Sequence, residues 1–185
     1  IRTPEGVLQR IVTWAGNAAL PTKTVDVHER IWTTLDADRA AKTLEIQALE
    51  RDLAGLLVKT PYVLTLSHPG INVVTAAELA GEMGPITHYA NAKTITGRAG
   101  LFPARYQSAD VDVANGKIIR SSNRRLRTIL MMIADNLVRC NHHFRALNAI
   151  WKSQGKDSRW SRVKVASRFT RILYQIVAGQ QVFKH

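Results

Sequence analysis

Apolar residues recur three and four positions apart along most of this chain, the spacing that gathers them on one side of an α-helix. The strongest pattern predicts a helix over residues 126–137, with one apolar face formed by Leu126, Ile129, Leu130, Ile133 and Leu137. Ser121 or Ser122 can cap that helix. The other predicted helices are residues 1–20, His28–Lys59, Tyr62–Ser67, a following helix that ends at Gly84-Pro85, Phe144–Ser153 and Trp160–Ala178. The pattern predicts a mainly α fold.

One small β-ribbon is compatible with this pattern. Asn115-Gly116 is a favourable pair for a two-residue hairpin turn. It lies between two short apolar stretches, Val111–Val113 and Lys117–Ile119, which are the predicted strands.

Residues 1–60 are predicted to form a helical arm that precedes a basic helical domain, residues 61–185. Six apolar residues of the long helix fall on heptad positions, namely Trp32, Leu35, Ile46, Leu49, Leu53 and Leu56. Arg39 and Lys42 interrupt the repeat midway. Two interpretations stay open: a coiled coil with another helix, or a helix that packs on its own domain.

The charge is concentrated in the last third of the chain. The net charge of the 185 residues is +12, and residues 114–185 hold fifteen Lys or Arg against only Asp135 and Asp157. Such a surface favours nucleic acid as a partner, and an anionic membrane is the competing candidate. No apolar run approaches the ~18 residues of a membrane span, and the single cysteine, Cys140, cannot form an internal disulfide. A soluble cytoplasmic protein is expected, with no membrane partner.

The segment of residues 61–84 has the spacing of a helix-hairpin-helix. Its turn contains Gly70, Ile71 and Asn72, and a tight glycine turn before a helix aims backbone N–H groups outward, where they can bind phosphate. An ordinary helix–turn–helix corner would have the same pattern.

Arginines crowd the start of the helix that follows the ribbon. The candidate phosphate-binding residues there are Lys117, Arg120, Asn123, Arg124, Arg125 and Arg127. Cations oppose the helix dipole at this end, and a bound phosphate would reverse the sign of that interaction. A merely solvated surface is the alternative.

Ser108 is the one serine in the polar loop before this cluster, and it is the candidate nucleophile. Asp110 and Asp112 are too few for a metal site on their own. Cys140, His142 and His143 do not make a four-ligand zinc site, so we expect a buried thiol and no metal in this chain. The four tryptophans are interpreted as core or interface residues.

Four segments, in order, resemble one known family: "LTLSHPGINVVTAAELAGEMGPITHY", "AGLFPARYQS", "NGKIIRSSNRRLRTILMMIADNLV" and "KVASRFTRILYQIV". They are similar to the C-terminal transposase domain of the DEDD insertion-sequence transposases, which are also called bridge-RNA-guided recombinases. The resemblance covers about residues 60–180, and residues 30–60 resemble the coiled-coil arm of that family. Asn72 and Ala109 stand where the family usually has glycine.

The resemblance implies a DNA transposase or recombinase whose serine becomes covalently joined to DNA, and it assigns that role to Ser108. It also implies an N-terminal RuvC-like domain with Mg²⁺, which this chain lacks, so that the chain alone would be inactive. DNA, a guide RNA and further protomers bound through the arm are the implied partners, in the cytoplasm of a bacterium or archaeon, associated with the nucleoid. A non-catalytic helix-hairpin-helix module that binds nucleic acid is the alternative.

Overall fold

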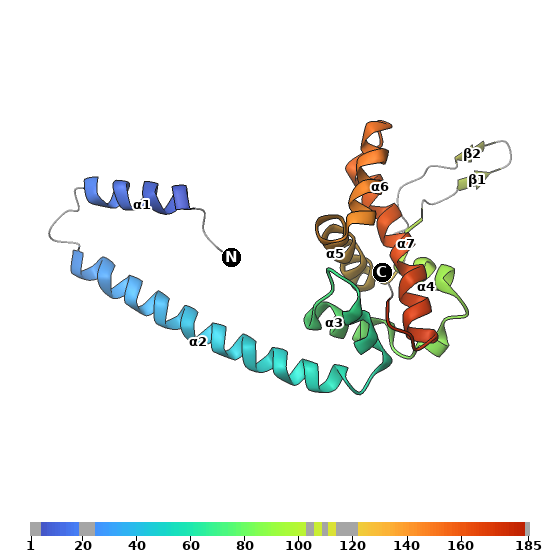
Figure 1. Ribbon diagram of the computed structural model, residues 1–185, viewed down its shortest axis with the longest axis horizontal. Coiled ribbons are helices and arrows are strands. Elements are labelled where there is room, and N and C mark those ends of the chain that lie inside the picture. The colour runs from blue at the N-terminus through green and yellow to red at the C-terminus, as the bar shows by residue number, and fades with distance from the viewer. Residues whose placement is uncertain (1–4, 19–24, 103–105, 109–110, 114–121, 184–185) are drawn as a thin grey trace. The chain divides into compact units, whose positions relative to one another are not determined.

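The computed structural model describes residues 5–18, 25–102, 106–108, 111–113 and 122–183 (Figure 1). The described chain is mainly helical, which confirms the predicted fold class. It divides into two compact units, Ile1–Ala48 and Leu49–His185. No helix in the described ranges combines the length and apolar character that crossing a bilayer demands.

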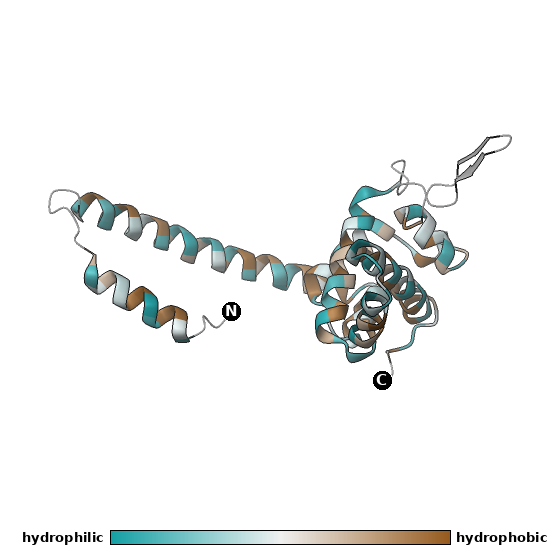
Figure 2. Ribbon diagram, turned by 90° about the horizontal axis from the view of Figure 1, so that it is seen from above, coloured by the Kyte–Doolittle hydropathy of each residue, from teal (hydrophilic) through white to brown (hydrophobic). Residues whose placement is uncertain are grey.

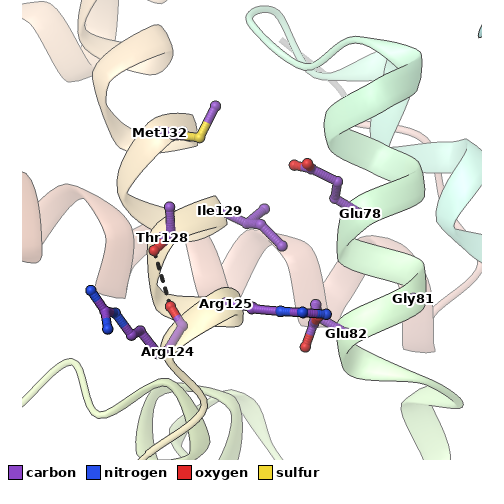
Figure 3. A pocket seen from close by; sticks show the side chains of 8 residues that line it. All are labelled: Glu78, Gly81, Glu82, Arg124, Arg125, Thr128, Ile129 and Met132. Carbon is purple, nitrogen blue, oxygen red and sulfur yellow. Dashed lines mark hydrogen bonds and ion pairs between the residues drawn. The ribbon is translucent and has the colours of Figure 1, made fainter. Parts of the chain in front are cut away.

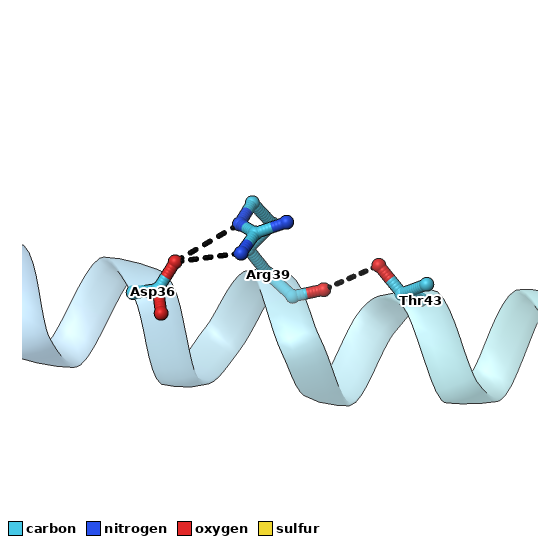
Figure 4. A network of polar contacts seen from close by, with 3 residues as sticks. All are labelled: Asp36, Arg39 and Thr43. Atoms are coloured by element: carbon cyan, nitrogen blue, oxygen red, sulfur yellow. Dashed lines mark hydrogen bonds and ion pairs between the residues drawn. The ribbon is translucent and has the colours of Figure 1, made fainter. Parts of the chain in front are cut away.

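The first unit holds helix α1 (Glu5–Asn17) and most of α2 (Val25–Leu57). Polar contacts between successive turns support α2. Arg39 donates to Asp36 Oδ1 through Nε (3.0 Å) and Nη2 (2.8 Å), and Thr43 Oγ1 donates to the Arg39 carbonyl oxygen at 2.8 Å (Figure 4). Such exposed i,i+3 pairs support the helix only weakly.

The apolar residues of α2 at the heptad positions are largely exposed to solvent. Trp32 is 72% exposed, and Leu35, Ile46, Leu49 and Leu56 are each more than half exposed. Each such side chain forgoes the roughly 1.5–3 kcal/mol that burial would contribute. The coiled coil therefore stays a prediction, and it would give this apolar stripe a partner.

The second unit is a bundle of short helices around two longer ones. Its helices are the 3₁₀ helices η1 (Pro61–Ser67) and η2 (Ile86–His88), and the α-helices α3 (Val73–Met83), α4 (Ala92–Ala99), α5 (Arg124–Cys140), α6 (His142–Ser153) and α7 (Ser158–Ala178). Helix α7 packs against α4, α5 and α6, and α5 also packs against α3.

The core lies where α5 and α7 face each other and their neighbours. All five residues of the predicted apolar face, Leu126, Ile129, Leu130, Ile133 and Leu137, are buried. They meet Phe169 and Leu173 of α7, which are fully buried, and Leu57 at the end of α2 is buried in the same cluster. In Figure 2 the helices of this unit carry apolar positions, in brown, on the sides that face one another.

Asparagine and aspartate side chains begin the α-helices of this unit. The caps of α3, α4, α5, α6 and α7 are Asn72, Asn91, Asn123, Asn141 and Asp157, and each accepts a hydrogen bond from a backbone N–H of the first turn. The prediction that Ser121 or Ser122 caps α5 is wrong. Asn123 takes the position because its Oδ1 accepts from the Leu126 N–H at 3.0 Å.

A two-stranded antiparallel ribbon is present in the described residues, and it is formed by a pair of strands that was not predicted. Strand β1 (Tyr106–Ser108) pairs with β2 (Val111–Val113), and Ser108 lies opposite Val111. The second predicted strand, Lys117–Ile119, and the Asn115-Gly116 turn lie outside the described residues. Val111–Val113 is thus a strand as predicted, with an upstream partner.

Two buried tyrosines fix the end of α3. Tyr62 Oη donates to the Gly84 carbonyl oxygen at 2.7 Å, and Tyr89 Oη donates to that of Met83 at 3.0 Å. Burial raises the pKa of both phenols. These contacts satisfy carbonyl groups that the end of a helix leaves without partners.

Candidate nucleic-acid interface

The predicted phosphate-binding turn lies between η1 and α3. Gly70 has φ +96°, and a Cβ there would lie 3.4 Å from the backbone C and O of Asn136 in α5. Ile71 is buried in the core. Asn72 is exposed, but its Oδ1 already accepts from Thr75 N (2.9 Å) and Thr75 Oγ1 (2.6 Å). The turn presents one polar side chain to solvent, and its glycine serves close packing on α5.

The residue before Pro69-Gly70, His68, is a member of this turn that sequence reasoning missed. It is 1% exposed, and its ring lies 4.3 Å from that of Phe183, 5.8 Å from Phe169 and 6.3 Å from Phe144, measured between centroids. His68 Nδ1 is 3.0 Å from the Pro69 carbonyl oxygen, which can only accept, so Nδ1 carries the proton. The buried imidazole thus stabilises the turn through its contact with the Pro69 carbonyl group.

Asn123 joins three helices at the start of α5. Besides capping α5, its Nδ2 donates to Glu82 Oε2 of α3 at 3.0 Å. Its backbone N–H donates to the Arg98 carbonyl oxygen of α4 at 2.9 Å. A side chain that is hydrogen-bonded through both its oxygen and its nitrogen positions the neighbouring helices, and the phosphate contact of Asn123 stays a prediction.

Arg127 is likewise engaged with the protein. Its Nε donates to the Ala99 carbonyl oxygen at 2.8 Å, and its Nη2 donates to Ser122 Oγ. Gly100, at φ +64°, leaves the necessary space, because a Cβ there would lie 2.6 Å from Ser122 Oγ and 2.7 Å from Arg127 Nη2. This guanidinium ties the start of α5 to the end of α4.

Arg124 and Arg125 are the two arginines of the cluster that face solvent. Arg125 is 86% exposed in its side chain, and its Nη1 lies 3.7 Å from Glu82 Oε1. The Arg124 guanidinium has no hydrogen bond or ion pair with the described residues. Figure 3 shows Arg125 extending toward Glu82 while Arg124 points away from α3. Of the predicted phosphate ligands in the described part of the chain, these two are available to an anion.

A surface pocket of about 530 Å³ lies between α3 and α5, beside these arginines. Its lining residues are Glu78, Gly81, Glu82, Arg124, Arg125, Thr128, Ile129 and Met132. Two carboxylates and two guanidiniums balance within the lining, so the pocket itself does not concentrate positive charge.

Ser108 is the last residue of β1, opposite Val111 in the ribbon. Lys117 and Arg120 lie outside the described residues. No cluster of three or more His, Cys, Asp or Glu that could hold a metal occurs in the described ranges. The prediction of a buried Cys140 is wrong, and its thiol is exposed. Cys140 lies in line with the apolar face of α5, but it is the last residue of that helix, and the buried residues of the helix end at Leu137.

Residues 63–149 match the model of the Transposase IS116/IS110/IS902 family. The matched range is consistent with the C-terminal region of a transposase of this type. This confirms the resemblance to insertion-sequence transposases found from the four sequence segments. No curated protein matches the chain.

The matched range of the transposase domain runs from η1 into α6. It includes the turn at Gly70, the ribbon with Ser108 and the start of α5 with Arg124 and Arg125. The family supports a transposase or recombinase role with DNA as the partner. Sequence spacing identified the exposed arginines, but it did not separate them from Arg127, whose partner at Ala99 is 28 residues away.

Proposed function

We propose that this chain is the part of an insertion-sequence transposase that grips the DNA backbone and supplies a serine nucleophile for strand exchange. The observation that carries the proposal is the extent of the transposase domain, residues 63–149, which includes the turn, the serine ribbon and the exposed arginines in one segment. The excess of positive charge over residues 114–185 supports the same partner.

DNA phosphates would bind first at Arg124 and Arg125, whose side chains are exposed at the N-terminal end of α5. Guanidiniums bind phosphate oxygens through paired N–H donors, and the N-terminal end of the helix favours the same charge. Lys117 and Arg120 would extend this contact along the chain. Arg127 and Asn123 would hold the helix start in place.

The turn at Gly70–Asn72 would supply a second backbone contact as a helix-hairpin-helix. Its first helix, η1, is a 3₁₀ helix, and its turn glycine adopts positive φ. Backbone N–H groups at such a turn recognise phosphate without reading sequence. This contact would therefore orient DNA on the domain and leave target choice to another component, for which the guide RNA is the proposed one.

Ser108 would carry out the covalent step. Its hydroxyl gives up its proton to a base, and Oγ forms a bond to phosphorus as the bond from phosphorus to one deoxyribose oxygen breaks. The released strand end takes up a proton and leaves as a hydroxyl. A hydroxyl of the exchanging strand then attacks the same phosphorus and restores Ser108, so the number of phosphodiester bonds is conserved.

Mg²⁺ is proposed for a RuvC-like domain outside this chain, as the resemblance to the DEDD insertion-sequence transposases implies. Further protomers would join through α2, whose exposed stripe includes Trp32, Leu35 and Leu49. Recombination between two duplexes needs several subunits, and burial of this stripe would hold them together.

The experiment is to trap a covalent protein–DNA adduct. The chain, joined to the RuvC-like domain that the proposal requires, is incubated with a radiolabelled element end and Mg²⁺, then denatured and separated by electrophoresis. We expect an adduct that Ser108→Ala abolishes and that Ser153→Ala, at the end of α6, retains. An adduct that persists in Ser108→Ala would show that another residue is the nucleophile.

A non-catalytic nucleic-acid-binding module is the second candidate. The observation that favours it is Gln107-Ser108-Ala109, where the family usually has a serine followed by glycine. On this alternative the chain binds DNA with a steep dependence on salt and forms no adduct under any of the conditions above.

A further inference from the structure

Two tryptophans meet on the surface where α6 turns into α7. Trp151 of α6 and Trp160 of α7 lie with ring centroids 5.6 Å apart and planes at 88°. The loop between the helices has Gly155 at φ +72°, which allows the tight reversal. Trp160 remains 39% exposed and Trp151 is half-buried, so the pair is fixed by mutual contact yet open to solvent.

Three cations lie over these rings. Lys164 Nζ is 5.2 Å and Lys156 Nζ is 5.7 Å from the centroid of Trp160, and Arg168 Cζ is 5.3 Å from that of Trp151. All three side chains are exposed, and none forms an ion pair with a described residue. The nearby Arg162 differs, because its Nε pairs with Asp135 Oδ1 at 2.6 Å.

The carboxylate nearest in sequence to this cluster is already engaged. Asp157 Oδ2 accepts from the Arg159 backbone N–H at 3.1 Å as the cap of α7. The Asp157 carboxylate interacts with the N-terminal end of α7, while Lys156, Lys164 and Arg168 lie over the tryptophan rings. The group of two tryptophans and three cations therefore keeps a net positive charge.

The cationic face continues along α7. Trp160, Lys164, Arg168 and Arg171 are spaced four, four and three residues apart and share one side of the helix, over about 16 Å. At its far end a pocket of about 230 Å³ is lined by Arg171 and Ser167 of α7, by Lys93 of α4 and by Phe102, which is 40% exposed. Aromatic and cationic groups thus recur at both ends of this face.

We propose that this face of α6 and α7, from Trp160 to Arg171, is a second nucleic-acid surface that binds a single strand. Proteins that hold single strands combine aromatic platforms for bases with cations along the backbone. Stacking a base on Trp160 is a stronger interaction than the exposed cation–π contact that it replaces. The displaced Lys164 or Lys156 then reaches a phosphate.

This surface is distinct from the duplex-binding arginines Arg124 and Arg125 at the start of α5, and it does not require Ser108 to be the nucleophile. It goes beyond the proposed function in giving the chain a place for an unpaired strand. The strand can be DNA, as exposed during strand exchange, or RNA. Both share the chemistry of stacked bases and phosphates, and the experiment separates them.

The test measures binding of fluorescein-labelled dT12, rU12 and a 20-base-pair duplex to the chain by fluorescence anisotropy at several salt concentrations. We expect Trp160→Leu to weaken single-strand binding roughly 5- to 100-fold and to change duplex affinity less than twofold. Lys164→Gln with Arg168→Gln should lower the slope of log K against log salt for the strand by about two. Tighter binding of dT12 would identify DNA as the natural single strand, and tighter binding of rU12 would identify RNA.

Trp32→Leu is the matched control, because that tryptophan is exposed on α2, and strand affinity should not change. Trp160→Phe keeps an aromatic face and should retain most of the affinity, whereas a loss equal to that of Trp160→Leu would mean only a structural role. Arg124→Gln with Arg125→Gln should weaken duplex binding and leave single-strand binding unchanged. Failure of the proposed duplex contact and failure of the proposed single-strand surface are therefore distinguishable. Unchanged strand affinity in folded Trp160→Leu, or an equal loss for the duplex, would overturn the proposal.

Discussion

Arg127 donates through Nε to the carbonyl oxygen of Ala99 at 2.8 Å and thereby fastens the first turn of α5 to the last residue of α4. We expect Arg127→Gln to lower the free energy of unfolding by about 1.5–3 kcal/mol, since a charged donor is lost at a half-buried site. Urea denaturation followed by circular dichroism measures the change. Arg124→Gln is the matched control and should stay within about 0.5 kcal/mol of the parent. Equal stabilities for the two variants would contradict the assigned division of roles.

Gly100 is expected to reject any side chain. Gly100→Ala places a methyl group 2.6 Å from Ser122 Oγ at φ +64°, so we expect a loss of about 1–3 kcal/mol in unfolding free energy. Gly81→Ala is the comparison, because Gly81 lies inside α3 and a methyl group there would meet nothing within 4 Å. Alanine there should stabilise α3 by about 0.5–1 kcal/mol. Thermal melts that shift both variants in the same direction would argue against this account.

Under the proposed function, Glu82 would compete with DNA for Arg125. Its Oε1 lies 3.7 Å from Arg125 Nη1, and its other oxygen accepts from Asn123 Nδ2 at 3.0 Å. Glu82→Gln keeps an oxygen for Asn123 and removes the negative charge, so duplex affinity should rise by up to about fivefold at low salt. Fluorescence anisotropy with a labelled duplex measures it, and the gain should shrink as salt increases. Glu50→Gln on α2 should leave the affinity unchanged, whereas a gain in both variants would indicate net charge alone.

Stability should decline at alkaline pH through Tyr62. Burial raises the pKa of Tyr62 above the value near 10 that the phenol has in an unfolded chain. The neutral phenol is therefore favoured by folding, and its contribution is complete below pH 10 and is lost as pH rises toward the folded-state pKa.

Tyr62→Phe removes this ionisation together with the bond to Gly84 O. We expect a loss of about 0.5–1.5 kcal/mol at pH 7 and a flatter decline above pH 10, from urea denaturation at each pH. Tyr89 has a raised pKa as well and retains part of the decline. A decline in Tyr62→Phe as steep as in the parent would exclude Tyr62 as its source.

The arm should mediate self-association. Leu35 is 56% exposed at a heptad position of α2, and we expect Leu35→Asp to shift a concentration-dependent oligomer to the monomer in sedimentation velocity. Ala37→Asp places the same charge on a different side of α2 and should leave the oligomer intact. If both variants remain oligomeric, the contact lies elsewhere in the chain.

Local patterns account for what the sequence predicted correctly. The α5 face from Leu126 to Leu137 follows from a 3-4 spacing inside one helix, and such spacing needs no knowledge of distant residues. The sequence predicts a ribbon around Asn115-Gly116 because this pair strongly favours a hairpin turn. The two residues that connect β1 and β2 are not such a pair, so the sequence does not predict that pairing. The cap of α5 was predicted at the wrong residue because several adjacent polar residues can cap a helix, and packing against Glu82 and Arg98 selects Asn123.

Nonlocal contacts explain the remaining differences at the candidate site. Arg127 and Arg124 look alike in the sequence, and the contacts of Arg127 with the carbonyl oxygen of Ala99 and with Ser122 Oγ distinguish them. His68 belongs to the turn motif, but its burial depends on Phe169 and Phe183, more than a hundred residues downstream. A sequence pattern therefore located the cationic region and could not say which cations are used by the fold.

Helix α7 packs against α4, α5, α6 and η1, and Phe183 just beyond it donates its backbone N–H to Ser67 Oγ at 2.8 Å. The earlier helices therefore cannot bury all of their apolar residues until α7 has left the ribosome. Before that point the nascent domain would expose apolar residues that α7 covers in the complete fold, the kind of surface that chaperones retain. A ribosome that stalls or terminates before α7 would release an open, protease-sensitive polypeptide rather than a smaller working domain.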